Sequence, residues 1–445
     1  MKIPVTPKPL SELLAQESAH LSEIISASIG PTPIGKYLHW DNLRHRDPPK
    51  GLTHEQWWTG VKFARLGLER NIPLMDKNGM PFTFSMPSLV TEYLHNIDSR
   101  GSGRIAMPSE VSNQETKTRF LVRSLIEEAI TSSQLEGAST TRKQAMEMIR
   151  SGKPPTDKSE QMIFNNLRGM EFIRQNQDEP LTPELVLAIH SEMMLDTIDD
   201  KDLGRLQTLD DERVSVVSND TQKVVHMPPD ANQLPDRLIA MCDFANGKGE
   251  TEFFHPVIRA IVLHLWLAYD HPFEDGNGRT ARALFYWSML NSGYWLFEFI
   301  SISSILRQAS GQYAQAFLYT ETDANDATYF IVHQLRVIKS ALQKLERFLE
   351  RKTREIRQAE KLLQGVDGLN YRQLALLSHA LRKPHADFTI NSHKVSHRIA
   401  YATARADLLS LVKIGLLKQR TIGNAMHFAA GDMLRELLTN KKKAG

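Results

Sequence analysis

Residues 271–282 read HPFEDGNGRTAR, and the organisation of the surrounding chain follows from this run. Upstream, residues 256–270 place apolar side chains at the spacing of a buried helix, and TARALFYWSML at 280–290 resumes that spacing. A second helix therefore begins at the glycine-rich turn Gly276-Asn277-Gly278. The unpaired backbone N–H groups of a helix start, together with the helix dipole, form an anion-binding site. Glycines allow phosphate oxygens to approach that backbone closely.

The charged side chains of this run suit a nucleotide triphosphate. Arg279 and Arg282 are three residues apart, so they lie on one helix face and can clamp one polyphosphate. Asp275 is placed to hold a Mg²⁺ ion that is otherwise bound by phosphate oxygens. His271 is the natural general base for an incoming hydroxyl group.

The run resembles, at every specified position, the motif HPFx(D/E)GNGRxxR of the Fic (filamentation induced by cAMP) family. The resemblance extends over about 160–345 and includes Gly204-Arg205 and NDATYF at 325–330. It implies a protein adenylyltransferase (AMPylase), which transfers AMP from ATP to a Ser, Thr or Tyr hydroxyl of a target protein. The alternative, a degenerate Fic fold that binds nucleotide without chemistry, is disfavoured because the motif is intact.

The resemblance also implies roles for individual residues. His271 would deprotonate the target hydroxyl, Asp275 would hold Mg²⁺ on the α and β phosphates, and Phe273 would anchor the loop. Arg279 would steady the β phosphate and Arg282 the γ phosphate. Tyr313 matches a position that lines the base pocket, although an aromatic residue there is equally compatible with the core. The implied nucleotide-binding residues are Asp275, Gly276, Asn277, Gly278, Arg279, Thr280, Ala281, Arg282 and Tyr313.

Residues 113–136 are predicted to form one helix, with an apolar stripe that includes Leu121 and Leu125 and a stop at Gly137. The end of this helix resembles the inhibitory motif (S/T)xxxE(G/N), with Ser132, Glu136 and Gly137 in the specified positions. In that motif the glutamate pairs with the second motif arginine and denies it to the γ phosphate. The alternative is a surface glutamate near a helix end.

Residues 204–229 favour a β-hairpin, because the β-branched runs RVSVV and QKVVHM flank SNDT. By resemblance to Fic proteins, this hairpin is the flap that docks the target segment by strand pairing. The implied docking residues are Val225, His226, Met227 and Pro228. A plain surface hairpin is the alternative.

The C-terminal part is predicted to be a basic module on a connector helix. A long helix capped by Asp326 should start at 327 and end near Gly365. The order helix, strand, helix, helix, hairpin beyond it resembles a winged helix-turn-helix, with a recognition helix near 396–414 and Gly423-Asn424 at the hairpin turn. Residues 351–445 carry 18 Lys and Arg against 7 Asp and Glu, a net charge of +11, whereas the remainder is −9. This favours phosphate attraction, so DNA is a candidate partner, although winged helices also bind proteins.

The remaining chain supplies broader expectations. Residues 1–110 should form a helical cap, in which Trp40, Trp57 and Trp58 are core residues rather than a ligand platform. His264 is interpreted as a hydrogen-bonded core histidine. Cys242 is the single cysteine, which indicates a reducing, cytoplasmic location, and no apolar run is long enough to span a membrane.

The predicted fold class is mainly α: a Fic-type helical core with a β-hairpin flap, a helical N-terminal cap and a C-terminal winged helix-turn-helix. The predicted divisions are a cap at 1–110, an inhibitory helix region at 111–150, the catalytic core at 151–345, a connector at 346–368 and a winged helix domain at 369–445. Two functions compete with an autoinhibited adenylyltransferase: an enzyme that removes AMP from modified proteins, and a DNA-binding regulator whose core senses nucleotide. The oligomeric state and the target stay open.

Overall fold

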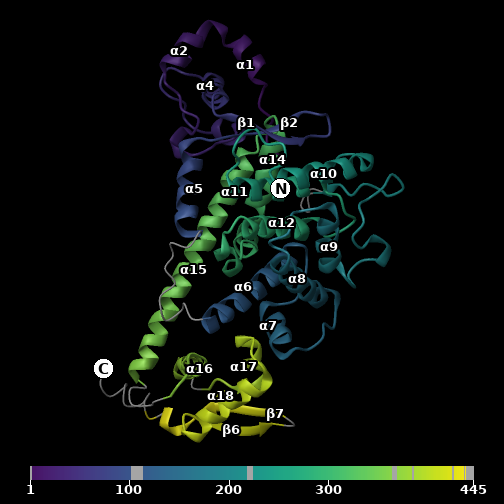
Figure 1. The fold of residues 1–445 in the computed structure, drawn as a ribbon. Helices are drawn as coiled ribbons and strands as arrows, with labels where there is room; N and C mark the ends of the chain where they lie inside the picture. The colour runs from purple at the N-terminus through teal and green to yellow at the C-terminus, as the bar shows by residue number, and fades with distance from the viewer. Residues whose placement is uncertain are drawn as a thin grey trace.

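Two buried helices, α11 (Pro256–Asp270) and α12 (Asn277–Asn291), form the centre of the molecule (Figure 1). The structure, a computed structural model, describes residues 3–101, 114–217, 224–362, 368–382, 385–422, 425–434 and 436. It is mainly helical, with small antiparallel sheets, as predicted. In the ranges given above, no helix combines the length and the apolar character that crossing a bilayer requires.

The N-terminal part is a helical cap that also contains a hairpin. Its elements are α1 (Leu10–Gln16), α2 (Leu21–Ser26), α3 (Trp40–Leu43), α4 (His54–Leu66), β1 (Glu69–Met75), β2 (Pro81–Ser85) and α5 (Ser88–Gly101). Trp57 and Trp58 are buried, which confirms their interpretation as core residues. The β1–β2 hairpin was not predicted, because β1 begins with three consecutive polar residues and contains Pro73. Arg65 fastens the cap by donating to the Tyr329 hydroxyl at 2.9 Å.

The central part wraps helices around α11 and α12. These are α6 (Gln114–Leu135), α7 (Arg142–Ser151), α8 (Lys158–Gln175), α9 (Pro183–Met194), α10 (Leu234–Ala245), α13 (Ser303–Leu306) and α14 (Ser310–Thr322). A short hairpin of β3 (Val216–Val217) and β4 (Val224–His226) confirms the predicted strand pair, while its tip lies outside the described residues. The side chain of Thr141 caps α7, and Gln144 completes a reciprocal capping box with it.

The long helix α15 (Thr328–Leu362) leads from the centre to the C-terminal elements (Figure 1). Asp326 accepts from the Thr328 N–H at 3.0 Å, as expected of its cap. The helix is continuous through the predicted division at 346, and the predicted stop near Gly365 lies outside the described residues. Beyond it follow α16 (Tyr371–Arg382), β5 (Phe388–Thr389), α17 (Ile390–His397), α18 (Tyr401–Lys413), β6 (Leu417–Ile422) and β7 (Ala425–Ala430).

These C-terminal elements have their own hydrophobic core, centred on buried residues such as Leu377, Leu408 and Phe428. The sheet order is β5-β7-β6. Along the chain the elements follow the predicted order of helix, strand, helix, helix and hairpin. The predicted Gly423-Asn424 turn lies outside the described residues. Helix α17 packs against α6 and α7, and thereby joins this module to the helix that carries Ser132 and Glu136.

Candidate active site

The loop between α11 and α12 is held by its own side chains. His271 ends α11 with a left-handed φ of 46°, and Gly276 precedes α12 with a φ of 84°. The Asn277 amide brackets Phe273: its oxygen accepts from the Phe273 N–H at 2.9 Å and its nitrogen donates to the Phe273 carbonyl at 2.7 Å. Phe273 is fully buried, as the anchoring role predicts. Asn277 therefore shapes the loop with its side chain and offers its backbone N–H to an anion.

His190, on α9, supports this loop and was missed in the sequence. Its ring stacks on Phe273 with centroids 3.8 Å apart. The Gly204 N–H donates to Nδ1 at 3.1 Å, so Nε2 carries the hydrogen and donates to the Asp275 carbonyl at 3.0 Å. Burial lowers the pKa of His190 to about 4, which keeps it neutral in this role.

Arg213, a second residue that the sequence did not reveal, ties the hairpin region to the motif. Its guanidinium donates to the carbonyls of Asp270 at 2.8 Å, His271 at 3.2 Å and Pro229 at 3.0 Å. These contacts fix the backbone on which the His271 side chain is mounted.

His271 is half-buried and has the protonation state that a general base needs. Burial, followed by the nearby His226, lowers the pKa of His271 to about 4. The imidazole is therefore neutral at physiological pH.

The two motif arginines are buried and converge on the start of α12. Arg279 donates to the Met193 carbonyl at 3.3 Å and lies 3.5 Å from the Asp275 carboxylate. Arg282 donates through Nε to the Ser132 hydroxyl at 2.9 Å and through Nη2 to the Ser132 carbonyl at 3.1 Å. Both guanidinium groups are thus fixed before any ligand binds.

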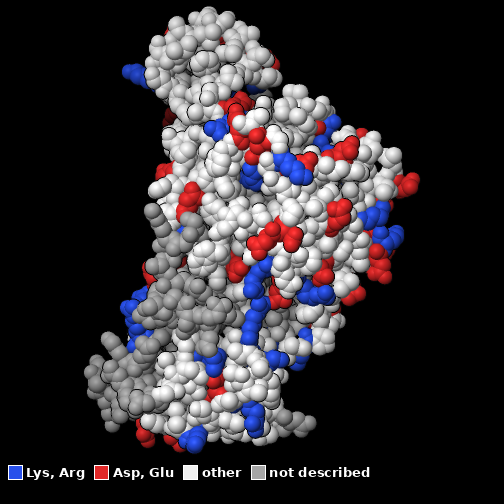
Figure 2. All heavy atoms as spheres, in the orientation of Figure 1, with Lys and Arg blue, Asp and Glu red and all other residues white. Residues whose placement is uncertain are grey.

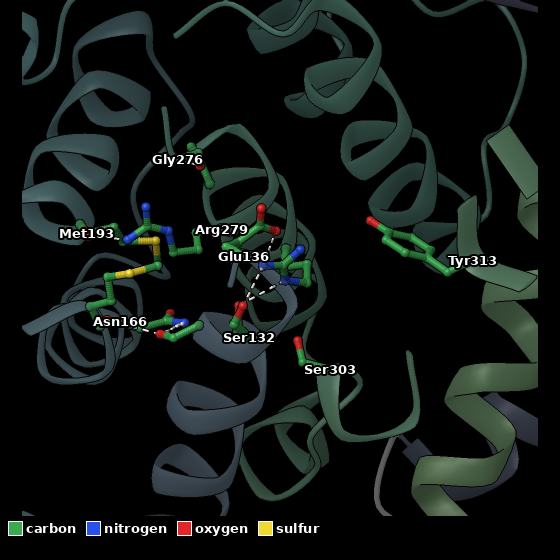
Figure 3. A network of polar contacts seen from close by, with 12 residues as sticks. Ser132, Glu136, Asn166, Met193, Gly276, Arg279, Ser303 and Tyr313 are labelled. Atoms are coloured by element: carbon green, nitrogen blue, oxygen red, sulfur yellow. Dashed lines mark hydrogen bonds and ion pairs between the residues drawn. The ribbon is translucent and has the colours of Figure 1, made fainter. Parts of the chain in front are cut away.

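Glu136 occupies the place where an anion would bind. Arg282 Nη2 donates to Glu136 Oε1 at 2.9 Å. Figure 3 shows that the Ser132 and Glu136 side chains lie close together in this network. A Cβ atom at Gly278 would collide with the Glu136 carboxylate. The carboxylate therefore lies against the backbone of the glycine-rich turn as well as on the arginine. Gly137, with a φ of 92°, ends the helix immediately afterwards.

The other residues assigned to the nucleotide lie at different depths. Thr280 and Ala281 are fully buried, and the Thr280 hydroxyl donates to the Gly276 carbonyl at 3.0 Å, so their side chains face the core. Tyr313, on α14, is half-buried and makes a 2.7 Å hydrogen bond with His264. His264 is buried, which confirms it as a hydrogen-bonded core histidine.

Helix α6 is anchored near its middle by the buried carboxylate of Glu128. This carboxylate accepts from the Tyr286 hydroxyl at 2.9 Å, the Ser301 hydroxyl at 2.8 Å and both the N–H, at 3.1 Å, and the hydroxyl of Ser303. Because Glu128 lies one helix turn before Ser132, this cluster fixes the position of Ser132 and Glu136 relative to α12.

We expect Glu128→Ala to lower the free energy of unfolding by about 2–5 kcal/mol, because the substitution leaves several buried donors without an acceptor. Urea denaturation measures this change. Glu147→Ala, at an exposed position on α7, is the matched control and should change stability by less than about 0.5 kcal/mol. Equal stability of the two variants would contradict the anchoring role.

The hairpin beside the motif presents one fixed and two exposed side chains. His226 donates through Nε2 to the Tyr269 carbonyl at 2.7 Å, and its Nδ1 lies 2.8 Å from a Glu321 carboxylate oxygen. Val224 and Met227 are exposed, Pro228 is buried, and Val225 is intermediate. His226 is therefore a fixed point of the hairpin, while its neighbours remain accessible.

Within the described ranges, neither Cys242 nor a cluster of metal ligands contributes to the site. Cys242 is buried and burial raises the pKa of its thiol to about 12, as expected of a core residue. Among the described residues, no group of three or more His, Cys, Asp or Glu side chains is arranged to hold a metal ion. The His255 side chain caps α11, and its Nε2 lies 3.0 Å from Oδ2 of Asp98.

The site thus combines a glycine-rich helix start, two buried arginines and a neutral histidine within a helical core. Residues 180–289 match the model of the Fic/DOC family, so the chain carries a domain of this family. The "Protein adenylyltransferase Fic" of Nematostella vectensis is 39% identical over 69 residues, which is 16% of this chain and 16% of that protein. The protein of the same name from Aedes aegypti is 38% identical over 69 residues, 16% of this chain and 14% of that protein.

A Fic family protein from Desulfovibrio desulfuricans G20 has a similar solved structure. It aligns with a TM-score of 0.50 and 17% identity, and covers 78% of this chain and 98% of that one. The likeness concerns the fold. The curated relatives match over about a sixth of their own length, so activity, substrates and partners are matters of proposal for the whole chain.

Proposed function

We propose that this protein is an autoinhibited protein adenylyltransferase that transfers AMP from ATP to a hydroxyl group of a target protein. The observation that carries the proposal is the pairing of Arg282 with Glu136 at 2.9 Å within an otherwise complete phosphate-binding turn. A carboxylate on this arginine competes with a phosphate group for the same donors. The relatives named protein adenylyltransferase Fic support this class of activity.

In this mechanism the chain positions ATP and removes one proton. The N–H groups of the 276–278 turn and the two motif arginines hold the phosphates. Neutral His271 accepts the proton of the target hydroxyl as its oxygen bonds to the α phosphorus. The bond between the α phosphorus and the bridging oxygen breaks, and pyrophosphate leaves. Positioning and charge stabilisation supply most of the rate in such reactions.

Asp275 fits a Mg²⁺ ion that is bound mainly by ATP. Its carboxylate is about half-exposed beside the anion site, and its Oδ1 accepts from the Gly276 N–H at 2.5 Å. One carboxylate together with phosphate oxygens is a common set of ligands for Mg²⁺. The ion would neutralise phosphate charge during transfer. The β3–β4 hairpin, with accessible Val224 and Met227, is proposed to align the target segment.

The experiment that tests this function determines which phosphate group of ATP is transferred to protein. Purified protein and Glu136→Gly are incubated with Mg²⁺ and ATP labelled on either the α or the γ phosphate, with a cell extract as the source of targets. Label on protein bands from the α form alone supports adenylyl transfer. Label from the γ form indicates phosphorylation, and loss of label from previously modified bands favours removal of AMP; either result rejects the proposal.

A second proposal concerns DNA and rests on α18. Arg405 and Lys413 are exposed on this helix. Arg398 instead pairs with Glu171 of α8, and the wing residues Lys418 and Arg420 pair with Asp432 and Asp387. DNA contact would therefore depend mainly on α18. Figure 2 shows basic side chains along the lower half of α15 and on the C-terminal elements.

We expect Arg405→Ala to weaken binding of duplex DNA and to reduce the slope of log affinity against log salt by about one, the effect of one lost phosphate contact. Fluorescence anisotropy over a salt series measures both quantities. Lys77→Ala, an exposed substitution in the N-terminal cap, should leave them unchanged. Binding that is absent, or insensitive to Arg405, would reject the DNA proposal.

A further inference from the structure

A basic cavity lies on α6 apart from the motif. It has a volume of about 360 Å³ and is bounded by α6, α7, residues 299–304 and α15. Positive side chains come from three helices and surround it: Arg123, Arg142, Lys344, Arg347 and Arg351. Among its described lining residues, Glu127 is the one carboxylate, and it is paired with Arg142 at 2.7 Å. The described lining residues therefore include five cationic side chains and one carboxylate.

The cations are held close together over an apolar floor. The guanidinium groups of Arg123 and Arg351 lie over the Phe348 ring, at 4.2 and 5.4 Å from its centroid. Phe299 and Leu345 extend this floor. Burial, followed by the charge of Arg142, lowers the pKa of Arg123 to about 10, so gathering these cations is unfavourable without an anion.

We propose that this cavity binds a small phosphorylated ligand with an aromatic ring, of the nucleotide class. The arginines and Lys344 would hold the phosphate groups, because guanidinium groups bind phosphate oxygens in pairs. The ring would lie against Phe299 and Leu345, because guanidinium groups already cover the Phe348 ring. The volume is within the usual range for a small-molecule site.

A ligand in this cavity would regulate AMP transfer through α6, a step that rests on the proposed function. Ser132 and Glu136 follow Arg123 on the same helix, roughly 13–20 Å along its axis at 1.5 Å per residue. A ligand that bridges α6 to α15 would stabilise α6 in the place where Glu136 occupies Arg282. Binding itself does not depend on any catalytic activity.

The test measures where phosphate compounds bind to the full-length protein. Inorganic triphosphate, ATP and adenosine are titrated by calorimetry, and hydrogen exchange of peptides locates the protected segments. We expect ATP to bind more tightly than inorganic triphosphate, adenosine to bind most weakly, and exchange to slow in residues 341–351 and 121–130. Protection confined to 271–282 would place the ligand in the motif and overturn the proposal.

Matched variants complete the test. Arg347→Gln/Arg351→Gln should weaken triphosphate binding by at least about tenfold, because two charge-assisted contacts are lost. Arg336→Gln/Arg357→Gln removes the same charge from the same helix, away from the cavity, and should change affinity by less than about twofold. Circular dichroism and the melting temperature check that both pairs fold. Equal losses of triphosphate affinity in the two double variants, or no loss in the first, would overturn the proposal. Equal affinity of the protein for ATP and for triphosphate would reject the site for the aromatic ring.

Discussion

Glu136→Gly is expected to raise the initial rate of AMP transfer by about 10–100-fold at subsaturating ATP. The carboxylate forms a 2.9 Å charge-assisted bond with Arg282, and bonds to charged groups contribute about 1.5–3 kcal/mol, or roughly one to two factors of ten. Removing it frees both the arginine and the backbone of Gly278 for phosphate. The measurement is incorporation of α-labelled AMP at several ATP concentrations, which separates kcat from KM.

Two further variants distinguish this release from a general loosening of the helix end. Glu136→Gln keeps the shape but loses the charge, so its rate should lie between those of wild type and Glu136→Gly. Glu147→Gly places a glycine at an exposed position on α7 and should leave the rate unchanged. A Glu136→Gly protein that folds, binds ATP as weakly as wild type and transfers no more AMP would remove Glu136 as the inhibitory group.

The parts of the site that are contiguous in sequence could be predicted from the sequence. The helix start at 276–278 follows from neighbouring residues, and the structure has it. The anchoring role of Phe273 was implied by the family resemblance, and this side chain is fully buried. The pair Arg282–Glu136 joins residues 146 positions apart, so no local pattern implies it. Resemblance to a family motif supplied that expectation.

The supporting residues could not be predicted, because their partners are set by the fold. His190 is an ordinary helical histidine until α9 brings it to Phe273 and Gly204. Arg213 bonds backbone carbonyls, which leave no side-chain signature in the sequence. The cap of α7 is different, because Thr141 and Gln144, three residues later, form a capping box that is local in the sequence.

His271→Ala, made in the Glu136→Gly background, is expected to reduce AMP transfer by about 10²–10⁴-fold, the usual contribution of a general base. Nucleotide affinity should change little, since the phosphates are held by Arg279, Arg282 and the 276–278 turn. The matched control is His95→Ala, at an exposed position on α5, which should retain full activity. Retained transfer in His271→Ala would eliminate this residue as the base.

The pH profile provides an independent test of the same base. The pKa of His271 is lowered to about 4, so the neutral, proton-accepting form predominates at every pH above that value. Protonation of His271 should therefore not lower the rate of Glu136→Gly between pH 8 and pH 6. The rate should decline only as the pH approaches about 4. A base with an ordinary histidine pKa would lose activity near pH 6.5 instead. A steep fall at that point would show that catalysis begins from a more solvated imidazole, with the hairpin and Arg213 displaced from the arrangement that buries it.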